Sequence, residues 1–269
     1  MPWFFIDHPI AAGEIKGINL RADPEPCFVP GDPGGAGSWG EKITLTGETA
    51  AHISKSLRMT PGESLCLCGP DRIAHTCVIT QISAEAVYVR RVSSAPADTE
   101  PPCEITLFYS LPKGSDKLDS VIQKSVELGA GKITPVLSER CVSRPSEKDF
   151  AKKQSRLQKI ALQAAMQSRR AFVPEIGGLT GFSEALRQAE NCELTIFFYE
   201  GGGEKLNKII TGHEKNIAVF IGPEGGYSDD EAESARQSGA KIATLGKRIL
   251  RTETAPVAAL AIIMDMLED

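Results

Sequence analysis

The chain has 269 residues, of which 41% are hydrophobic and 24% charged, and its formal net charge is −5. This length suits two domains, and this composition is typical of a folded soluble protein and excludes a disordered one. No apolar run is long enough to span a bilayer, and the first residues lack the basic segment and cleavage site of a signal peptide. We therefore expect a cytoplasmic protein without a membrane partner.

The seven cysteines are odd in number and scattered along the chain. Cys66 and Cys68 form a C-x-C pair rather than a C-x-x-C pair, and no histidine lies at a ligand-like distance from them. On a strand, two such side chains share one face, where free cysteine packs as a small hydrophobic residue. We therefore expect free thiols and no metal.

The first hundred residues contain short apolar or alternating segments that turn residues separate, which predicts strands over 3–6, 42–46, 64–68, 74–82 and 86–92. One helix is predicted between them, over 49–57. Residues 30–37 are too rich in glycine and proline for either element and predict a surface loop. Together these features indicate a small β-barrel domain over residues 1–98.

Residues 93–102 are the best candidate for a linker, because strands and helices alternate after them. Strands are predicted over 104–110, 132–137, 195–199, 217–221 and 242–245. Helices are predicted over 116–128, 149–168, 229–237 and 256–267, with Gly129 ending the first of them. Such alternation predicts an α/β domain over 99–269 with a mostly parallel sheet.

A glycine-rich loop, Ile221-Gly-Pro-Glu-Gly-Gly226, follows a strand and precedes a helix that Ser228 and Glu231 cap. Ligands bind at the carboxyl ends of strands in open α/β sheets, and glycine lets the backbone approach them. The loop has neither phosphate-binding signature, and Glu224 is a poor neighbour for phosphate. A cationic ligand such as S-adenosylmethionine (SAM) suits it better, although a single loop of this kind is usually a plain turn.

A second loop, Leu245-Gly-Lys-Arg-Ile-Leu-Arg-Thr-Glu-Thr-Ala255, also follows a short strand and precedes an apolar helix, which Thr252 or Thr254 can cap. Arg248 and Arg251 then lie near a helix N-terminus, where cations oppose the helix dipole. An RNA phosphate or a reacting imide would explain them. The alternative is that they are exposed arginines without a partner.

Segment 144–170 holds eight basic and two acidic residues, a formal charge of +6 in an acidic protein. This charge favours an anionic partner, and Lys113 and Lys117 bracket another loop at a strand end that could contact phosphate. A solvated helix face and ordinary surface lysines are the alternatives.

Five motifs of this chain resemble motifs of the RsmE family. They are Phe-Ile-Gly-Pro-Glu-Gly-Gly (220–226), Leu-Gly-Lys-Arg-Ile-Leu-Arg-Thr-Glu-Thr-Ala (245–255), Gln-Lys-Ser-Val-Glu-Leu-Gly (123–129), Ser-Glu-Arg (138–140) and Gln-Lys-Ile-Ala-Leu-Gln-Ala-Ala-Met-Gln-Ser (158–168). Those proteins are bacterial 16S rRNA (uracil-N3)-methyltransferases of the SPOUT superfamily, and residues 52–63 also resemble their first domain. The resemblance implies a PUA-like β-barrel, a SPOUT domain with a C-terminal trefoil knot, and a homodimer. It further implies SAM as the cofactor, and N3 of one uridine in the 16S rRNA of the small ribosomal subunit as the target.

We predict the following site residues from the loops and the resemblance together. Arg251 stabilises the base anion, and Glu253 orients the base or accepts its proton. The cofactor contacts are Leu111, Ile221, Gly222, Pro223, Glu224, Gly225, Gly226, Leu245, Gly246, Ile249, Leu250 and Thr252. The RNA contacts are Arg58, Lys113, Lys117, Arg140, Arg156, Arg169, Arg170 and Arg248.

Four features depart from the family pattern and affect the RNA contacts: Trp3, a longer 113–117 loop, Arg169 in place of a typical glycine, and an insertion over 30–40. Two other readings stay open. The chain could be another SPOUT enzyme that acts on tRNA or a ribose 2′-hydroxyl, or an RNA-binding protein without catalysis.

Overall fold

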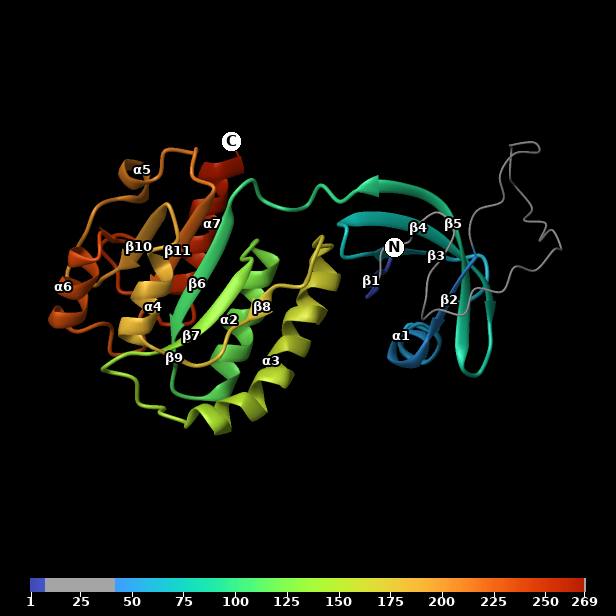
Figure 1. Cartoon of the computed structure of the whole chain (residues 1–269), viewed down its shortest axis with the longest axis horizontal. Helices are drawn as coiled ribbons and strands as arrows, with labels where there is room; N and C mark the ends of the chain where they lie inside the picture. The colour runs from blue at the N-terminus through green and yellow to red at the C-terminus, as the bar shows by residue number, and fades with distance from the viewer. Residues whose placement is uncertain (8–41, 269) are drawn as a thin grey trace. The chain divides into compact units, whose positions relative to one another are not determined.

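The computed structural model describes residues 1–7 and 42–268, so the predicted loop 30–37 and the insertion 30–40 lie outside the described residues. The chain divides into two compact units, Met1–Thr99 and Glu100–Asp269 (Figure 1). Each unit has its own sheet and its own core.

The first unit is a curled sheet of five strands in the order β1-β3-β4-β5-β2 (Figure 1). Its strands are β1 (Trp3–Phe5), β2 (Lys42–Thr46), β3 (Ser64–Cys68), β4 (Ile73–Ile82) and β5 (Ala86–Pro96). All neighbours are antiparallel except β1 and β3, which are parallel. His75, Cys77 and Ile79 of β4 are buried and alternate with half-buried residues, as a strand with one face on the core predicts.

Two predictions in this unit are corrected. The helix expected over 49–57 is a short α-helix, α1 (Gly47–Ala51), followed by a π-helical turn, η1 (His52–Ser56). Residues 93–96 belong to β5 rather than to the linker, because their backbone pairs with the start of β4.

The second unit is built on a sheet in the order β12-β10-β11-β6-β7-β8, in which all described pairs are parallel. Its strands are β6 (Glu104–Ser110), β7 (Lys132–Leu137), β8 (Glu175–Ile176), β9 (Thr180–Gly181), β10 (Leu194–Phe198), β11 (Asn216–Ile221) and β12 (Lys241–Ala243). The predicted parallel α/β architecture is confirmed. Residues 217–221 of β11 and 107–110 of β6 are buried, which explains the nearly continuous apolar sequence of these two runs.

Helices cover this sheet: α2 (Ser115–Glu127), α3 (Glu147–Ser168), α4 (Phe182–Ala189), α5 (Leu206–Ile209), α6 (Asp229–Gln237) and α7 (Ala255–Glu268). Alanines of α4 and α6 pack on Phe108, Phe197 and Phe220 of the sheet. Phe108 and Phe220, on neighbouring strands, stack with ring centroids 4.6 Å apart. Helix α2 packs against α3 and α7.

Four elements of this unit were not predicted: β8, β9, α4 and α5. The two strands have two residues each and α5 has four, which is too short for a hydrophobic period. Helix α4 has eight residues, which is shorter than the window over which a helical period can be recognised in sequence.

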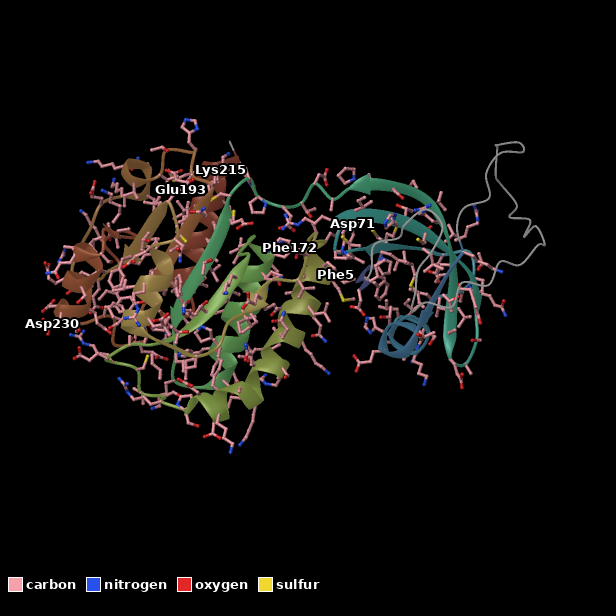
Figure 2. All side chains as sticks on the ribbon, in the orientation of Figure 1. Phe5, Asp71, Phe172, Glu193, Lys215 and Asp230 are labelled. Carbon is pink, nitrogen blue, oxygen red and sulfur yellow. The ribbon has the colours of Figure 1, made fainter. Side chains whose placement is uncertain are left out.

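The amino ends of β10 and β11 are tied together at one edge of the sheet. The Glu193 carboxylate accepts a hydrogen bond from the Lys215 amide at 2.7 Å (Figure 2). The carboxyl ends of β6, β10, β11 and β12 consequently meet at the opposite edge, where the loops after them gather.

Candidate functional site

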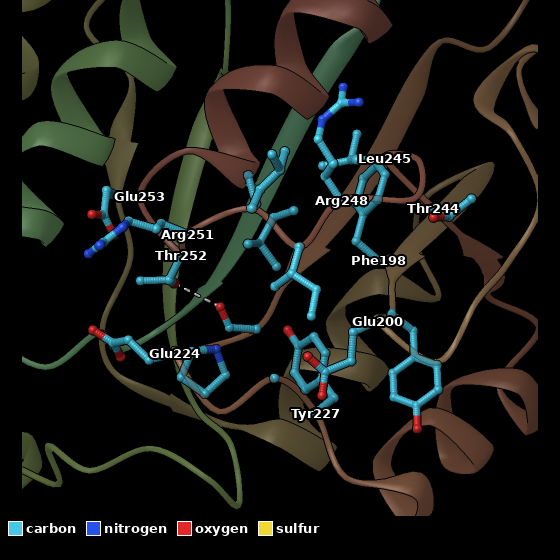
Figure 3. A pocket seen from close by; sticks show the side chains of 18 of the residues that line it. Phe198, Glu200, Glu224, Tyr227, Thr244, Leu245, Arg248, Arg251, Thr252 and Glu253 are labelled. Atoms are coloured by element: carbon cyan, nitrogen blue, oxygen red, sulfur yellow. Dashed lines mark hydrogen bonds between the residues drawn. The ribbon is translucent and has the colours of Figure 1, made fainter.

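A pocket of about 360 Å³ lies at the carboxyl ends of β10, β11 and β12 (Figure 3). Among its lining residues are ten of the twelve predicted cofactor contacts, namely Ile221, Gly222, Pro223, Glu224, Gly226, Leu245, Gly246, Ile249, Leu250 and Thr252. The two predicted catalytic residues, Arg251 and Glu253, also line it, as do Lys117 and Arg248. The structure therefore brings both glycine-rich loops to one cavity.

The remaining two predicted cofactor contacts do not line this pocket. Leu111 is buried, and its amide donates to the Val136 carbonyl at 2.9 Å. Gly225 lies against Arg140, whose Nη1 donates to the Gly225 carbonyl at 2.9 Å. Gly225 is next in the chain to the lining residues Glu224 and Gly226, whereas neither chain neighbour of Leu111 lines the pocket.

The first loop turns tightly after β11. The Gly226 amide donates to the Pro223 carbonyl at 2.9 Å, and Gly226 has a left-handed φ of 66°. Glycine suits that conformation, and a Cβ atom on Gly226 would lie 2.9 Å from the Glu200 carboxylate, which would have to move aside. Ser228 and Glu231 form the predicted capping box at the start of α6.

The second loop is fastened to the first by a hydrogen bond. The Thr252 hydroxyl donates to the Gly222 carbonyl at 2.9 Å. Among the described residues, the Thr252 hydroxyl bonds only to Gly222 and Tyr109, and the Thr254 hydroxyl makes no hydrogen bond. The prediction that one of these threonines caps α7 is therefore wrong.

Two carboxylates, Glu224 and Glu253, line the pocket near the start of α2. Lys117 donates to Glu224 at 2.7 Å and lies 3.6 Å from Glu253. Burial acts to raise the pKa of Glu224, but hydrogen bonds from Lys117 and from backbone amides hold that pKa below its ordinary value. The hydrogen bond to Glu224 raises the pKa of Lys117.

Phe198, Tyr199 and Glu200 line the pocket and were not predicted. They lie at the end of β10, next to β11 in the sheet. The end of the predicted strand 195–199 could therefore have indicated that these residues lie beside the first loop. Tyr199 donates a hydrogen bond to Asp229, which raises the pKa of Tyr199. Glu200 lies 3.8 Å from Arg140, and both side chains are about half exposed, so the predicted contact of Arg140 with RNA stays a prediction.

Several cations of the second loop are exposed. Lys247, Arg248 and Arg251 make no side-chain hydrogen bond or ion pair with any residue that the structure describes. Ile249 beside them is 85% exposed. An anionic partner is the simplest reason for such a surface at the mouth of a pocket.

The basic segment 144–170 does not present its whole charge to solvent. Arg156 makes a two-pronged ion pair with Asp119, with Nη2 2.8 Å from Oδ1. Arg144 donates to the carbonyls of Ser138 and Glu139. The exposed residues Lys148, Lys153 and Lys159 remain for an anionic partner.

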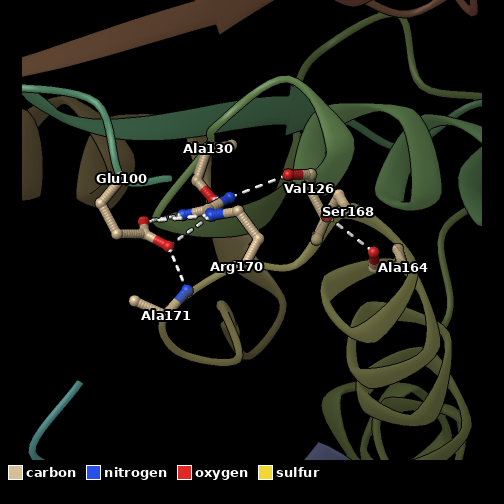
Figure 4. Close-up of polar contacts among 7 residues, drawn as sticks. All are labelled: Glu100, Val126, Ala130, Ala164, Ser168, Arg170 and Ala171. Carbon is tan, nitrogen blue, oxygen red and sulfur yellow. Dashed lines mark hydrogen bonds and ion pairs between the residues drawn. The ribbon is translucent and has the colours of Figure 1, made fainter. Parts of the chain in front are cut away.

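The prediction that Arg170 contacts RNA is wrong. Its side chain is 3% exposed and donates to Glu100 and to the carbonyls of Val126 and Ala130 (Figure 4). Arg169, another predicted contact, ends α3 with a left-handed φ of 58°, the conformation that favours the typical glycine. Arg58 is exposed on the first unit and Lys113 on the second.

No helix among the described residues is long and apolar enough to cross a membrane. In the same part of the chain, no group of three or more His, Cys, Asp or Glu residues could hold a metal ion.

The parallel sheet, with its pocket of glycine-rich backbone between carboxylates and free arginines, defines an α/β enzyme of the RNA methyltransferase class, and the family model described as RNA methyltransferase domain matches residues 99–264. Within that class, the chain belongs to the ribosomal RNA small subunit methyltransferase E family. It is 33% identical to the Bacillus subtilis member over 82% of this chain and 89% of that protein. It is 31% identical to the Synechocystis member over 84% of this chain and 74% of that protein.

Two solved structures are also similar. The Neisseria gonorrhoeae member, bound to S-adenosyl methionine, has a TM-score of 0.78 and 33% identity, covering 99% of this chain and 98% of that one. A methyltransferase from Legionella pneumophila in complex with SAM has a TM-score of 0.76 and 31% identity, covering 86% of this chain and 94% of that one.

Proposed function

We propose that this chain transfers a methyl group from SAM to N3 of one uridine in 16S rRNA. The observation that carries the proposal is the joining of the two glycine-rich loops into one pocket by the Thr252–Gly222 hydrogen bond. The family supports the reaction class, and the two SAM-bound neighbours support the cofactor.

The pocket residues fit SAM. Gly226 offers backbone where a Cβ would meet Glu200, and the carboxylates of Glu200, Glu224 and Glu253 line the cavity, where they favour a cationic ligand such as a sulfonium. When bound, SAM supplies an electrophilic methyl group on its sulfonium. The backbone of Ile221, Gly222 and Leu245 would hold it, and the first loop would screen it from water.

Arg251 and Glu253 would act on the base. Uracil N3 carries a proton and is a poor nucleophile until that proton leaves. The Arg251 guanidinium would stabilise the negative charge that develops on the base, and Glu253 would accept the proton. Arg251 has no partner among the described residues, so its guanidinium is available for this role.

RNA phosphates would contact the exposed cations of the second loop, Arg248 among them, and those of α3. The first unit, including Arg58, would act as the RNA-binding domain. As the resemblance implies, we also propose a homodimer and a C-terminal trefoil knot, and we propose a cytoplasmic location. The mass in solution by analytical ultracentrifugation tests the dimer.

The test is methylation of 30S subunits and of naked 16S rRNA from a strain that lacks its own enzyme, followed by mass mapping of the RNA. One methylated uridine whose mass label lies on the base is the expected result. Methylated tRNA or a labelled ribose would identify another SPOUT enzyme. Absence of SAM binding in calorimetry would identify an RNA-binding protein without catalysis.

A further inference from the structure

Lys117, predicted above as a phosphate contact, occupies an unusual position. It lies in the first turn of α2, and its Nζ atom faces two other loops. The Nζ atom is 2.7 Å from Oε1 of Glu224, in the loop after β11, and 3.6 Å from Oε2 of Glu253, in the loop before α7. One cation therefore connects three segments that meet at the carboxyl edge of the sheet.

The local charge opposes a phosphate at this position. Lys117 and its two carboxylates sum to −1, and Glu224 also accepts the Lys113 amide on both oxygens at 3.1 Å. A phosphate that approached Lys117 would meet two carboxylates within a few ångströms, and like charges at that distance repel. The side chain of Lys113 is different, because it is exposed and pairs with no described residue.

Glu253 depends on Lys117 in particular. Its Oε2 atom is buried and has no hydrogen-bond donor among the described residues. The Lys117 ammonium lies 3.6 Å from this oxygen, so it compensates the negative charge of the Glu253 carboxylate without forming a normal hydrogen bond to Oε2. A buried carboxylate oxygen with a nearby cation and a free lone pair can accept a proton from a ligand in the adjoining pocket.

We propose that Lys117 is a positioning residue for the methyl transfer: by bridging Glu224 and Glu253, it holds the Glu253 carboxylate in place and directed at the pocket. This inference rests on the proposed function. In the step, the proton on uracil N3 moves to a Glu253 oxygen, and the N3 electron pair forms the bond to the methyl carbon. The bond from that carbon to sulfur breaks, its pair stays on sulfur, and Glu253 releases the proton to solvent.

The test compares Lys117→Met with Lys113→Met in steady-state methylation and in RNA binding as a function of salt. Lys117→Met is expected to lower kcat by about 10²-fold, within the range for a general base, and to leave KM for RNA nearly unchanged. Lys117→Arg should restore most of kcat, since it keeps the charge. Lys117→Gln serves if the methionine variant does not fold.

The salt dependence of the affinity for RNA distinguishes a lysine that contacts a phosphate from a lysine that positions Glu253. Each phosphate contact on single-stranded RNA contributes about 0.7 to the slope of log affinity against log salt, so Lys113→Met should lower the slope by about that amount and Lys117→Met should not. A lower slope for Lys117→Met, or an unchanged kcat, overturns the proposal.

A stability measurement keeps this inference separate from the proposed function. The shift in urea midpoint caused by Lys117→Met should be smaller in a Glu253→Gln background, because the bridge is already broken there. Equal shifts in the two backgrounds overturn the bridge even if the enzyme methylates 16S rRNA. If the effects of the Lys117 and Glu253 substitutions on the urea midpoint are coupled but the protein methylates no RNA, the proposed function is refuted and the bridge is kept.

Discussion

The Thr252 hydroxyl donates to the Gly222 carbonyl at 2.9 Å, and the Tyr109 hydroxyl lies 3.1 Å from the same threonine oxygen. Because Thr252 has a single proton, Tyr109 is the donor in the second bond. Burial raises the pKa of Tyr109, so the phenol keeps its proton at any physiological pH. One threonine thus joins the end of β6 to both loops of the pocket.

Replacing Thr252 with valine should therefore weaken the pocket and the fold together. The change leaves the half-buried Gly222 carbonyl and the buried Tyr109 hydroxyl without this partner, at a cost of about 1–3 kcal/mol in the free energy of unfolding. Urea denaturation measures the stability, and calorimetry measures a weaker affinity for SAM. Thr254→Val is the matched control, because that threonine is exposed. Equal losses in both variants would contradict the role of Thr252.

Gly222→Val should abolish SAM binding. A Cβ atom on Gly222 would lie 3.2 Å from the Gly226 carbonyl carbon and 3.2 Å from the buried Tyr227 ring, so the larger side chain must displace the first loop. Some stability should be lost as well, because the Tyr227 ring is fully buried in the core and cannot give way.

Gly178→Ala is the control for that substitution, since an added Cβ there meets nothing within 4 Å. Calorimetry with SAM and circular dichroism separate binding from folding in both variants. An unchanged SAM affinity in Gly222→Val would contradict the assignment of this loop.

The pocket was largely predictable because strand ends are visible in sequence. Apolar runs ending in glycine-rich turns located both loops, and parallel strands bring such turns to one edge. The ion pairs between charged side chains at that edge could not be predicted from the sequence. Lys117, Glu224 and Glu253 are far apart in the chain, and nothing local in any of the three loops shows that one lysine bridges the two carboxylates.

Arg251→Ala should lower kcat while the affinity for SAM is kept. The guanidinium is exposed and pairs with no described residue, so its removal costs the fold little and removes charge stabilisation in the transition state, about 10²-fold or more in rate. Single-turnover methylation of 16S rRNA measures the loss. Near-wild-type turnover with SAM bound would refute the role of Arg251.

Two buried thiols should resist alkylation in the folded protein. Burial, followed by the neighbouring Cys66, raises the pKa of Cys77 to about 12, and burial raises the pKa of Cys103 to about 11. The reactive thiolate is scarce at mildly alkaline pH in both cases. Peptide mass spectrometry after iodoacetamide treatment should find both unmodified in native protein and modified in denatured protein. Equal labelling in the two states would contradict the burial of these thiols.

Arg170 shows most clearly where charge patterning misled the sequence interpretation. It lies in the same basic segment as Arg156, but Glu100, its partner, is separated from it by 70 residues, and no local pattern reveals that pairing. Its Nη1 atom donates to two backbone carbonyls, and its guanidinium lies 5.1 Å from the Phe172 ring.

Arg170→Met should consequently destabilise the second unit by about 3–5 kcal/mol, because it leaves the largely buried Glu100 carboxylate without its cation. Adding Glu100→Gln should recover part of that loss. Arg156→Met is the matched control: its ion pair with Asp119 is half exposed and should cost less than about 1 kcal/mol. The affinity for RNA should fall no further in the Arg170 variant than its unfolded fraction explains. If Arg170→Met instead kept its urea midpoint and lost RNA binding, the guanidinium would be an RNA contact after all.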